Sequence, residues 1–106
     1  MPLNYQNPGP TREEIDTTTG PVVLDFGTAW CGHCQLAAPA VEAALAAIAG
    51  VAHIQVEDGP GRRLGRSFRI KLWPTLVFLK DGQEAARVVR PTRSDDLNVA
   101  IAAIRD

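Results

Sequence analysis

The chain has 106 residues, of which 45% are hydrophobic and 22% charged, and its formal net charge is −1. This length fits a single domain spanning residues 1–106, with the composition of an ordinary globular protein. The balanced charge produces no overall field that would attract nucleic acid or an anionic membrane surface, so we expect neither as a partner.

Residues 1–10 are polar and rich in Pro and Asn, and they lack the basic region and apolar core of a secretory signal. The initial Met argues against a removed leader, and no stretch approaches the roughly 18 apolar residues of a membrane span. We therefore expect a cytoplasmic protein. In that reducing compartment a lone cysteine pair is more often catalytic or metal-binding than structural.

The first two elements are a short helix and a buried strand. Thr11 and Glu14 have the spacing of a capping box, which predicts a helix that begins there and ends within residues 17–20. The near-continuous apolar run 21–26 is typical of a central strand that is covered on both faces.

A long helix and a second strand follow. The alanine-rich stretch that begins at Cys31 predicts a helix that ends at Gly50 and is kinked by Pro39. The run 51–57 alternates well enough to predict another buried strand.

The next elements are shorter. A turn at 58–61 precedes a short, strongly basic helix over 62–68. The apolar run 75–79 predicts a third strand, and the Asp-Gly pair at 81–82 predicts a hairpin to an antiparallel strand over 84–89.

The chain closes with an amphipathic helix, which residues 94–96 (Ser-Asp-Asp) should cap and whose Leu97, Ile101 and Ile104 fall on one face. A short edge strand near Leu3 is a further option. The order of helices and strands predicts an α/β fold with a central mixed sheet flanked by helices on both faces.

Both cysteines lie in the stretch Trp30-Cys31-Gly32-His33-Cys34, where the first strand meets the long helix. Two cysteines at this spacing can close a disulfide ring and reopen it without moving the rest of the chain. Because a helix N-terminus carries unpaired N–H groups and about half a positive charge, it favours a thiolate at Cys31. Cys31 is therefore the expected nucleophile on a substrate disulfide, and Cys34, one turn further in, the thiol that resolves the mixed disulfide.

Two other readings of the cysteine pair are a structural disulfide or buried thiols without function, and a zinc site. A structural zinc needs about four ligands. The chain offers the two thiols, His33 between them and His53 elsewhere, and so short a ring hardly lets them converge. We expect no metal and no cofactor beyond the thiols.

Asp25 lies in the middle of the first predicted strand, where an ionised carboxylate is costly. A carboxyl group in that position could exchange a proton with Cys34 while the mixed disulfide resolves. The alternative is a strand-end aspartate that reaches solvent.

Three separated features make the chain resemble the thioredoxin family over nearly its whole length. They are Asp25-Phe26 followed by the CxxC stretch, Pro39 five residues past the second cysteine, and Trp73-Pro74-Thr75 before the hairpin. The resemblance implies the thioredoxin fold, thiol–disulfide oxidoreductase activity on protein disulfides, and a proton-carrier role for Asp25.

The resemblance also implies a cis-proline at Pro74, which faces the CxxC ring beside backbone groups that pair with a bound peptide. The alternative is an ordinary trans-proline at a strand start. The residues expected to bind substrate are Trp30, Gly32, His33, Trp73, Pro74 and Thr75.

His33 bears on the direction of the reaction. Thioredoxins that act as reductants usually have Pro here, whereas His resembles the active sites of protein disulfide isomerases. An imidazole near the Cys31 thiolate favours the reduced form, which makes the disulfide more oxidising. A disulfide oxidase or isomerase is therefore one alternative function, and a non-catalytic docking module is another. The alternative for His33 itself is a solvent-facing side chain with little influence on the cysteines.

Four departures from the family pattern stand out. Gly27 lies where a large residue such as Trp is frequent, and Trp73 lies where an aliphatic residue or Thr is usual. We hypothesise that Trp73 fills the surface that Gly27 leaves open and offers substrates an aromatic platform; a buried core Trp is the alternative. Arg90 replaces a groove-lining Gly, which predicts a narrower, more basic groove. His53 stands where Lys is common near the buried carboxylate, and we favour a satisfied core histidine over one that tunes Asp25.

A basic cluster precedes the Trp-Pro pair and consists of Arg62, Arg63, Arg66, Arg69 and Lys71. Such a run is usually a solvated helix face, although an acidic partner protein would also suit it. We expect a monomer that acts on disulfide-containing proteins and takes its electrons from a reductase or a small thiol.

Overall fold

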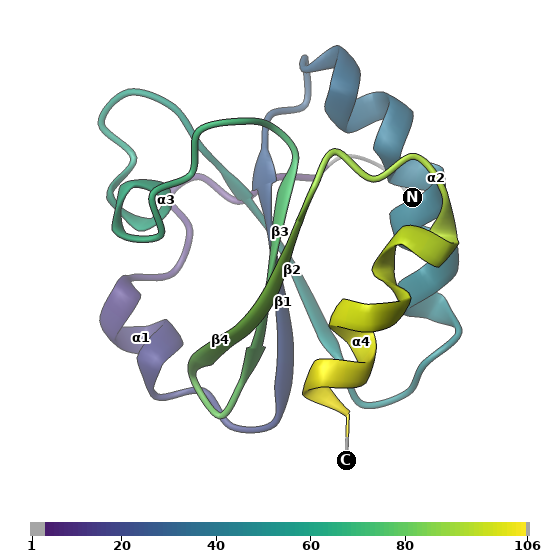
Figure 1. Ribbon diagram of the computed structural model, residues 1–106. Helices are drawn as coiled ribbons and strands as arrows, with labels where there is room; N and C mark the ends of the chain where they lie inside the picture. The colour runs from purple at the N-terminus through teal and green to yellow at the C-terminus, as the bar shows by residue number, and fades with distance from the viewer. Residues whose placement is uncertain (1–3, 106) are drawn as a thin grey trace.

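The computed structural model describes residues 4–105, and its architecture is a four-stranded sheet between two pairs of helices (Figure 1). The elements in chain order are α1 (Arg12–Asp16), β1 (Pro21–Gly27), α2 (Gly32–Ala46), β2 (Ala52–Glu57), α3 (Arg63–Ser67), β3 (Thr75–Lys80), β4 (Gln83–Val89), a 3-10 helix (Ser94–Leu97) and α4 (Asn98–Ile104). In Figure 1, α1 and α3 lie on one side of the sheet and α2 and α4 on the other. The predicted α/β fold is confirmed.

The sheet is mixed, with the strand order β2-β1-β3-β4. β1 runs parallel to β2 and antiparallel to β3, and β3 and β4 form the predicted antiparallel hairpin. Asp81 and Gly82 at the hairpin turn have φ values of 51° and 81°. Two successive left-handed residues are what a tight turn between twisted strands needs, which explains the Asp-Gly pair.

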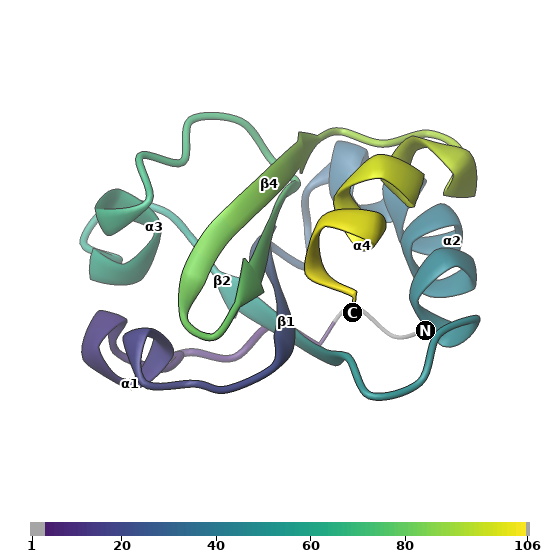
Figure 2. The same ribbon diagram turned by 60° about the horizontal axis from the view of Figure 1, so that its bottom comes forward.

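The alternation of side chains along β1 divides the apolar core between the two faces of the sheet. Val23 contributes to the core under α2 and α4, whereas Val22, Leu24 and Phe26 contribute to the core under α1 and α3. Figure 2 shows α2 and α4 side by side over the first of these faces. Because successive strand residues point to opposite faces, Asp25 shares the face of Val23 and points toward α2.

The N-terminal helix has the predicted cap. The Thr11 hydroxyl accepts a hydrogen bond from the Glu14 backbone N–H at 3.1 Å, and the Glu14 carboxylate accepts one from the Thr11 N–H at 3.0 Å. Within residues 4–105, every helix is too short or too polar to span a lipid bilayer.

Two predicted helix boundaries are wrong. α2 continues through Pro39 but ends at Ala46 rather than at Gly50, because Leu45 is its last buried side chain and packing, more than propensity, stabilises a helix. Residues 94–96 do not cap α4 directly, since they form part of a 3-10 turn. The carboxylate of Asp96 caps that turn by accepting hydrogen bonds from two backbone N–H groups before it. Leu97, Ile101 and Ile104, which were predicted to share one face, are all buried.

The expected edge strand near Leu3 lies outside the described residues. Close to it, Gln6 forms an isolated parallel bridge with Val56 at the free edge of β2. The Gln6 N–H donates to the Gln55 carbonyl at 2.9 Å, and the Gln6 carbonyl accepts from the Glu57 N–H at 3.0 Å. These bonds hold the N-terminal segment beside the sheet.

Candidate functional site

Cys31 is the N-cap residue of α2 and lies where the sequence predicts a reactive thiol. Its backbone is extended, with φ −77° and ψ 120°, and its sulfur accepts a hydrogen bond from the Cys34 N–H at 3.3 Å. The Thr28 carbonyl accepts the Cys31 N–H at 3.3 Å and holds the preceding loop closed. The Cys31 sulfur therefore receives both the helix dipole and a backbone N–H, which stabilise negative charge.

Cys34 lies one turn deeper and is 2% exposed, against 8% for Cys31. Both cysteines are free thiols. Burial, and then the hydrogen bond with Cys31, raise the pKa of Cys34 to about 12, against the smaller lowering effects of bonds with Thr28 and Tyr5. At neutral pH Cys34 is thus a thiol, and its sulfur needs a proton acceptor before it can attack.

Asp25 is buried, with 4% of its surface exposed. The alternative that it reaches solvent is therefore wrong. Its Oδ2 lies 3.0 Å from Nε2 of His53 and 3.5 Å from Nε2 of Gln55, both on the neighbouring strand β2. Its Oδ1 is buried with no hydrogen-bond partner among residues 4–105. The carboxyl group is held by one oxygen, and the other can accept a proton.

His53 is largely buried, with 12% of its side chain exposed. The expectation of a satisfied core histidine agrees with the structure, because His53 has a hydrogen-bond partner. The partner that satisfies His53 is the site carboxylate itself.

Tyr5 is the site residue that the sequence analysis missed. Its hydroxyl lies next to the Cys34 sulfur, and burial, together with the nearby acidic groups, raises the pKa of the phenol above its ordinary value. A Cβ atom on Gly27 would lie 2.5 Å from the Cys34 sulfur and 3.0 Å from the Tyr5 hydroxyl. Tyr5, and not Trp73 as hypothesised, therefore fills the space beside Gly27. The unusual glycine signalled that space, but no local pattern connects it with Tyr5.

A small cavity joins these groups behind the cysteine pair. It is lined by Tyr5, Asp25, Cys34, Ala37, Ala38, Val41, Gln55 and Pro74. The resolving thiol, the buried carboxyl group and the proline before β3 therefore line one small space.

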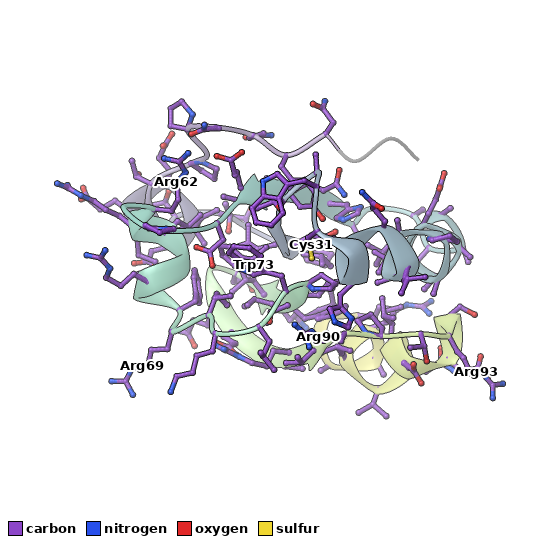
Figure 3. All side chains as sticks on the ribbon, turned by 90° about the horizontal axis from the view of Figure 1, so that it is seen from above. Cys31, Arg62, Arg69, Trp73, Arg90 and Arg93 are labelled. Atoms are coloured by element: carbon purple, nitrogen blue, oxygen red, sulfur yellow. The ribbon has the colours of Figure 1, made fainter. Side chains whose placement is uncertain are left out.

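Trp73 and Trp30 form an edge-to-face pair on the rim of the site, with ring centroids 5.8 Å apart and an interplanar angle of 78°. Trp30 is 74% exposed, whereas Trp73 is half-buried and its indole N–H donates to Asp58 Oδ2 at 2.9 Å. Figure 3 shows Trp73 beside Cys31 at this end of the molecule. Trp73 is thus not a fully buried core residue.

Arg90 is bonded to the backbone around Pro74. The Trp73–Pro74 peptide bond is cis. The Arg90 backbone N–H donates to the Pro74 carbonyl at 2.9 Å, and the Arg90 side chain donates through Nε to the Trp73 carbonyl at 2.8 Å. Arg90 has φ 52°, a left-handed conformation that favours glycine. Thr75 is buried, and its hydroxyl donates to the Leu72 carbonyl, so it does not face outward.

The remaining residues of the CxxC stretch, Gly32 and His33, are exposed on the first turn of α2. His33 makes no hydrogen bond or ion pair within the described part of the chain. Residues 4–105 also contain no group of three or more His, Cys, Asp or Glu side chains that could hold a metal ion.

Comparison with known proteins gives consistent results. The family model described as Thioredoxin matches residues 6–103. The solved structure of thioredoxin 2 from Pseudomonas aeruginosa PAO1 in its reduced form is 52% identical, with a TM-score of 0.83, over 94% of this chain and 93% of that one.

Two curated relatives are more distant. "Thioredoxin Asp f 28" of Aspergillus fumigatus is 40% identical over 63% of this chain, and the match spans 62% of that protein's length. The thioredoxin of Chlamydia trachomatis is 33% identical over 74% of this chain and 78% of its own. These likenesses favour neither an oxidase or isomerase nor a docking module. By its family model, its fold and its CxxC spacing, the chain belongs to the thioredoxin family.

Proposed function

We propose that the protein is a thiol–disulfide oxidoreductase that reduces or exchanges protein disulfides through the Cys31/Cys34 dithiol. The observation that carries the proposal is the difference between the two thiols. Cys31 caps α2 at the surface end of the site, whereas Cys34 is buried and its pKa is raised to about 12. One sulfur is thus ready to attack, and the other is held back as a thiol until a mixed disulfide has formed.

The reaction proceeds in two displacements. The Cys31 thiolate attacks one sulfur of the substrate disulfide, the S–S bond breaks, and the first substrate thiolate leaves. Cys34 then loses its proton and attacks the Cys31 sulfur, which releases the second substrate thiolate and leaves a Cys31–Cys34 disulfide. Two electrons pass from the dithiol to the substrate.

Asp25 is the proton acceptor in this proposal. Asp25 and Cys34 line the same cavity, and Oδ1 of Asp25 has no other hydrogen-bond partner in the described chain. His53 holds Oδ2 at 3.0 Å and so positions the carboxyl group. Tyr5 contributes at the sulfur, because its hydrogen bond lowers the pKa of Cys34 and favours the thiolate that attacks.

The substrate-binding surface is the rim around Cys31. The exposed indole of Trp30, the edge of Trp73 and the first turn of α2 at Gly32 and His33 offer apolar and polar contacts to a peptide. Pro74 is buried against the cavity and shapes its wall, and Thr75 fixes the loop behind it. Bound substrate would thus cross Trp73 beside the cysteine pair.

We propose that the net reaction is reduction of the substrate. His33 is exposed and has no hydrogen-bond partner in the described chain, so we expect it to stabilise the Cys31 thiolate only weakly. The electron donor would be a reductase or a small thiol. A monomeric state and a cytoplasmic location stay predictions from the sequence.

Reduction of insulin disulfides by dithiothreitol tests the proposal. The wild type should accelerate it and the Cys31→Ser variant should not. Mixed with insulin without dithiothreitol, the reduced Cys34→Ser variant should accumulate a one-to-one mixed disulfide visible by mass spectrometry. No acceleration by the wild type would instead support a docking module. The reduction potential in glutathione buffers should be about −270 mV, and a value of about −180 mV would identify an oxidising or isomerising enzyme.

A further inference from the structure

A groove beside the active site lies between α3 and the loop that leads to β3, and we call it the basic groove. It is lined by Asp58, Gly59, Arg62, Arg66, Arg69, Ile70, Lys71 and Trp73. We propose that the basic groove binds a carboxylate-rich segment of the substrate protein, close in sequence to the disulfide that Cys31 attacks. This inference rests on the proposed function and names the class of substrate that the site prefers.

The charges of the groove are uneven and largely uncompensated. Four of its lining residues are cations and one is a carboxylate. Arg62 is paired with Glu57, whereas the exposed side chains of Arg66, Arg69 and Lys71 form no ion pair within residues 4–105. Since the whole chain has a net charge of −1, these cations represent a local concentration of positive charge.

The only carboxylate in the groove lining is already engaged. Oδ2 of Asp58 accepts the indole N–H of Trp73 at 2.9 Å, which fixes the ring as one wall of the groove. Asp58 thus acts as part of the wall and does not pair with a lining arginine. The three unpaired cations remain available to carboxylates from outside.

Arg69 occupies a backbone position that normally favours glycine. It follows the C-terminus of α3 with φ 57°, its N–H donates to the Arg66 carbonyl, and the next N–H, that of Ile70, donates to the Gly65 carbonyl. A left-handed residue at this point of a helix end is usually Gly. An arginine here places a long cation on the groove at the cost of backbone strain. Because glycine would avoid that strain, the presence of arginine suggests that its side chain has a role.

Trp73 connects the basic groove with the cysteine pair. Its ring lines the groove, packs edge-to-face on Trp30 and directly precedes Pro74, which lines the cavity around Cys34. In Figure 3 Trp73 lies between the side of the molecule that carries Arg62 and Arg69 and the position of Cys31. A substrate chain that crosses Trp73 from Cys31 therefore enters the groove, where guanidinium groups can bind carboxylates through paired hydrogen bonds.

The test compares two cyclic disulfide peptides that differ only in three residues beside one cysteine, Asp in one and Asn in the other. The second-order rate constant for their reduction by the reduced protein is measured by stopped-flow fluorescence. At about 20 mM salt we expect the Asp peptide to react about five- to tenfold faster, and at about 0.5 M salt the preference should fall below about twofold, because salt screens exposed charges.

Two double variants with the same change in charge locate the effect. Arg69→Gln with Lys71→Gln removes two cations of the groove, and Gln at position 69 keeps a side chain on the left-handed backbone. Arg93→Gln with Arg105→Gln is the control, since both side chains are exposed and Figure 3 shows Arg93 at the opposite end of the molecule from Arg69. The groove variant should lose most of the preference for the Asp peptide, and the control should keep it.

The outcomes separate the inference from the proposed function. Equal rates for the two peptides with the wild type, or an equal loss of preference in both double variants, would overturn the docking role of the groove while reduction of the Asn peptide remains intact. If the wild type reduces neither peptide, the proposed function itself fails. If the groove variant unfolds at a lower temperature than the wild type, the single variant Arg66→Gln replaces it, because that variant leaves the strained position 69 unchanged. The same ratio of rates for the Asp and Asn peptides is then measured, and it should again fall.

Discussion

The hydroxyl of Tyr5 and the sulfur of Cys34 lie next to each other beside Gly27, which has no side chain to separate them. Tyr5 reaches this position because the Gln6 bridge holds the N-terminal segment along β2. Burial disfavours the thiolate form of Cys34, and a phenol donor beside the sulfur offsets part of that effect.

The Tyr5→Phe variant should therefore resolve mixed disulfides more slowly. Loss of a hydrogen bond to a charged group costs about 1.5 kcal/mol or more, which corresponds to about a tenfold slower step. The measurement is the decay of the mixed disulfide between Cys31 and a chromogenic aromatic thiol in a single turnover. The rate of the first attack by Cys31 serves as the internal control and should not change. Decay at the wild-type rate would exclude a role for the Tyr5 hydroxyl.

The Gly27→Ala variant should be less stable than the wild type. The added methyl group would lie 2.5 Å from the sulfur of Cys34, which is itself buried, so the surrounding groups would have to shift. Overpacking of this kind costs about 1–3 kcal/mol, measured by urea unfolding of the reduced protein.

Gly32→Ala is the matched control for this substitution. A Cβ at Gly32 has no neighbour within 4 Å, and the residue is exposed in the first turn of α2. Ala should stabilise that helix slightly, by about 0.5 kcal/mol. Equal stability of the two alanine variants would mean that the space beside Gly27 is not filled.

The contact between His53 and Asp25 can be tested by a double-mutant cycle. His53→Leu leaves the buried carboxyl group with only the 3.5 Å contact to Gln55, so we expect a loss of about 1–3 kcal/mol in the free energy of unfolding. In an Asp25→Asn background the same substitution should cost less, because the charge that His53 satisfies is gone. An identical cost in both backgrounds would show that His53 contributes only by packing.

The burial of Cys34 predicts how its reactivity depends on pH. Because burial, and then the hydrogen bond with Cys31, raise the pKa of this thiol from 9.0 to about 12 in the wild type, its thiolate increases with pH up to that value. In the Cys31→Ser variant the burial of Cys34 remains, so its alkylation by iodoacetamide should be very slow at pH 8 and should still rise about tenfold per pH unit above pH 9. A plateau near pH 9 would indicate an ordinary, solvated thiol.

The same shift has a consequence for stability. Between pH 9 and 12 the unfolded chain releases the Cys34 proton and the folded chain keeps it, so stability present below pH 9 is lost as the pH rises through this window. Cys34→Ala should remove that part of the decline.

Arg90 carries a strained backbone and covers an acceptor that a bound peptide could use. Both Arg90→Gly and Arg90→Ala uncover the Trp73 carbonyl, so both should reduce peptide disulfides about two- to threefold faster. Only glycine relieves the left-handed conformation at φ 52°, so Arg90→Gly should be more stable than Arg90→Ala by about 1 kcal/mol. Slower reduction by both variants would instead assign Arg90 to substrate binding.

Local patterns in the sequence were enough for most of the fold. The capping box at Thr11, the Asp-Gly turn and the cysteine at the start of α2 involve residues within a few positions of one another, so their geometry follows from short-range hydrogen bonds and φ/ψ preferences. The end of α2 near Gly50 and the start of α4 near Ser94 were predicted wrongly, because tertiary packing ends α2 at Ala46 and a 3-10 turn capped by Asp96 precedes α4.

The sequence by itself determined the reactive pair and its scaffold, since two cysteines at this spacing on a helix start define the chemistry locally. Only the tertiary structure decided what surrounds Cys34. Tyr5 comes from a segment held to the sheet edge, and His53 reaches Asp25 across paired strands. These contacts depend on strand register and chain path, which bring together residues far apart in the chain, and no local pattern contains that information.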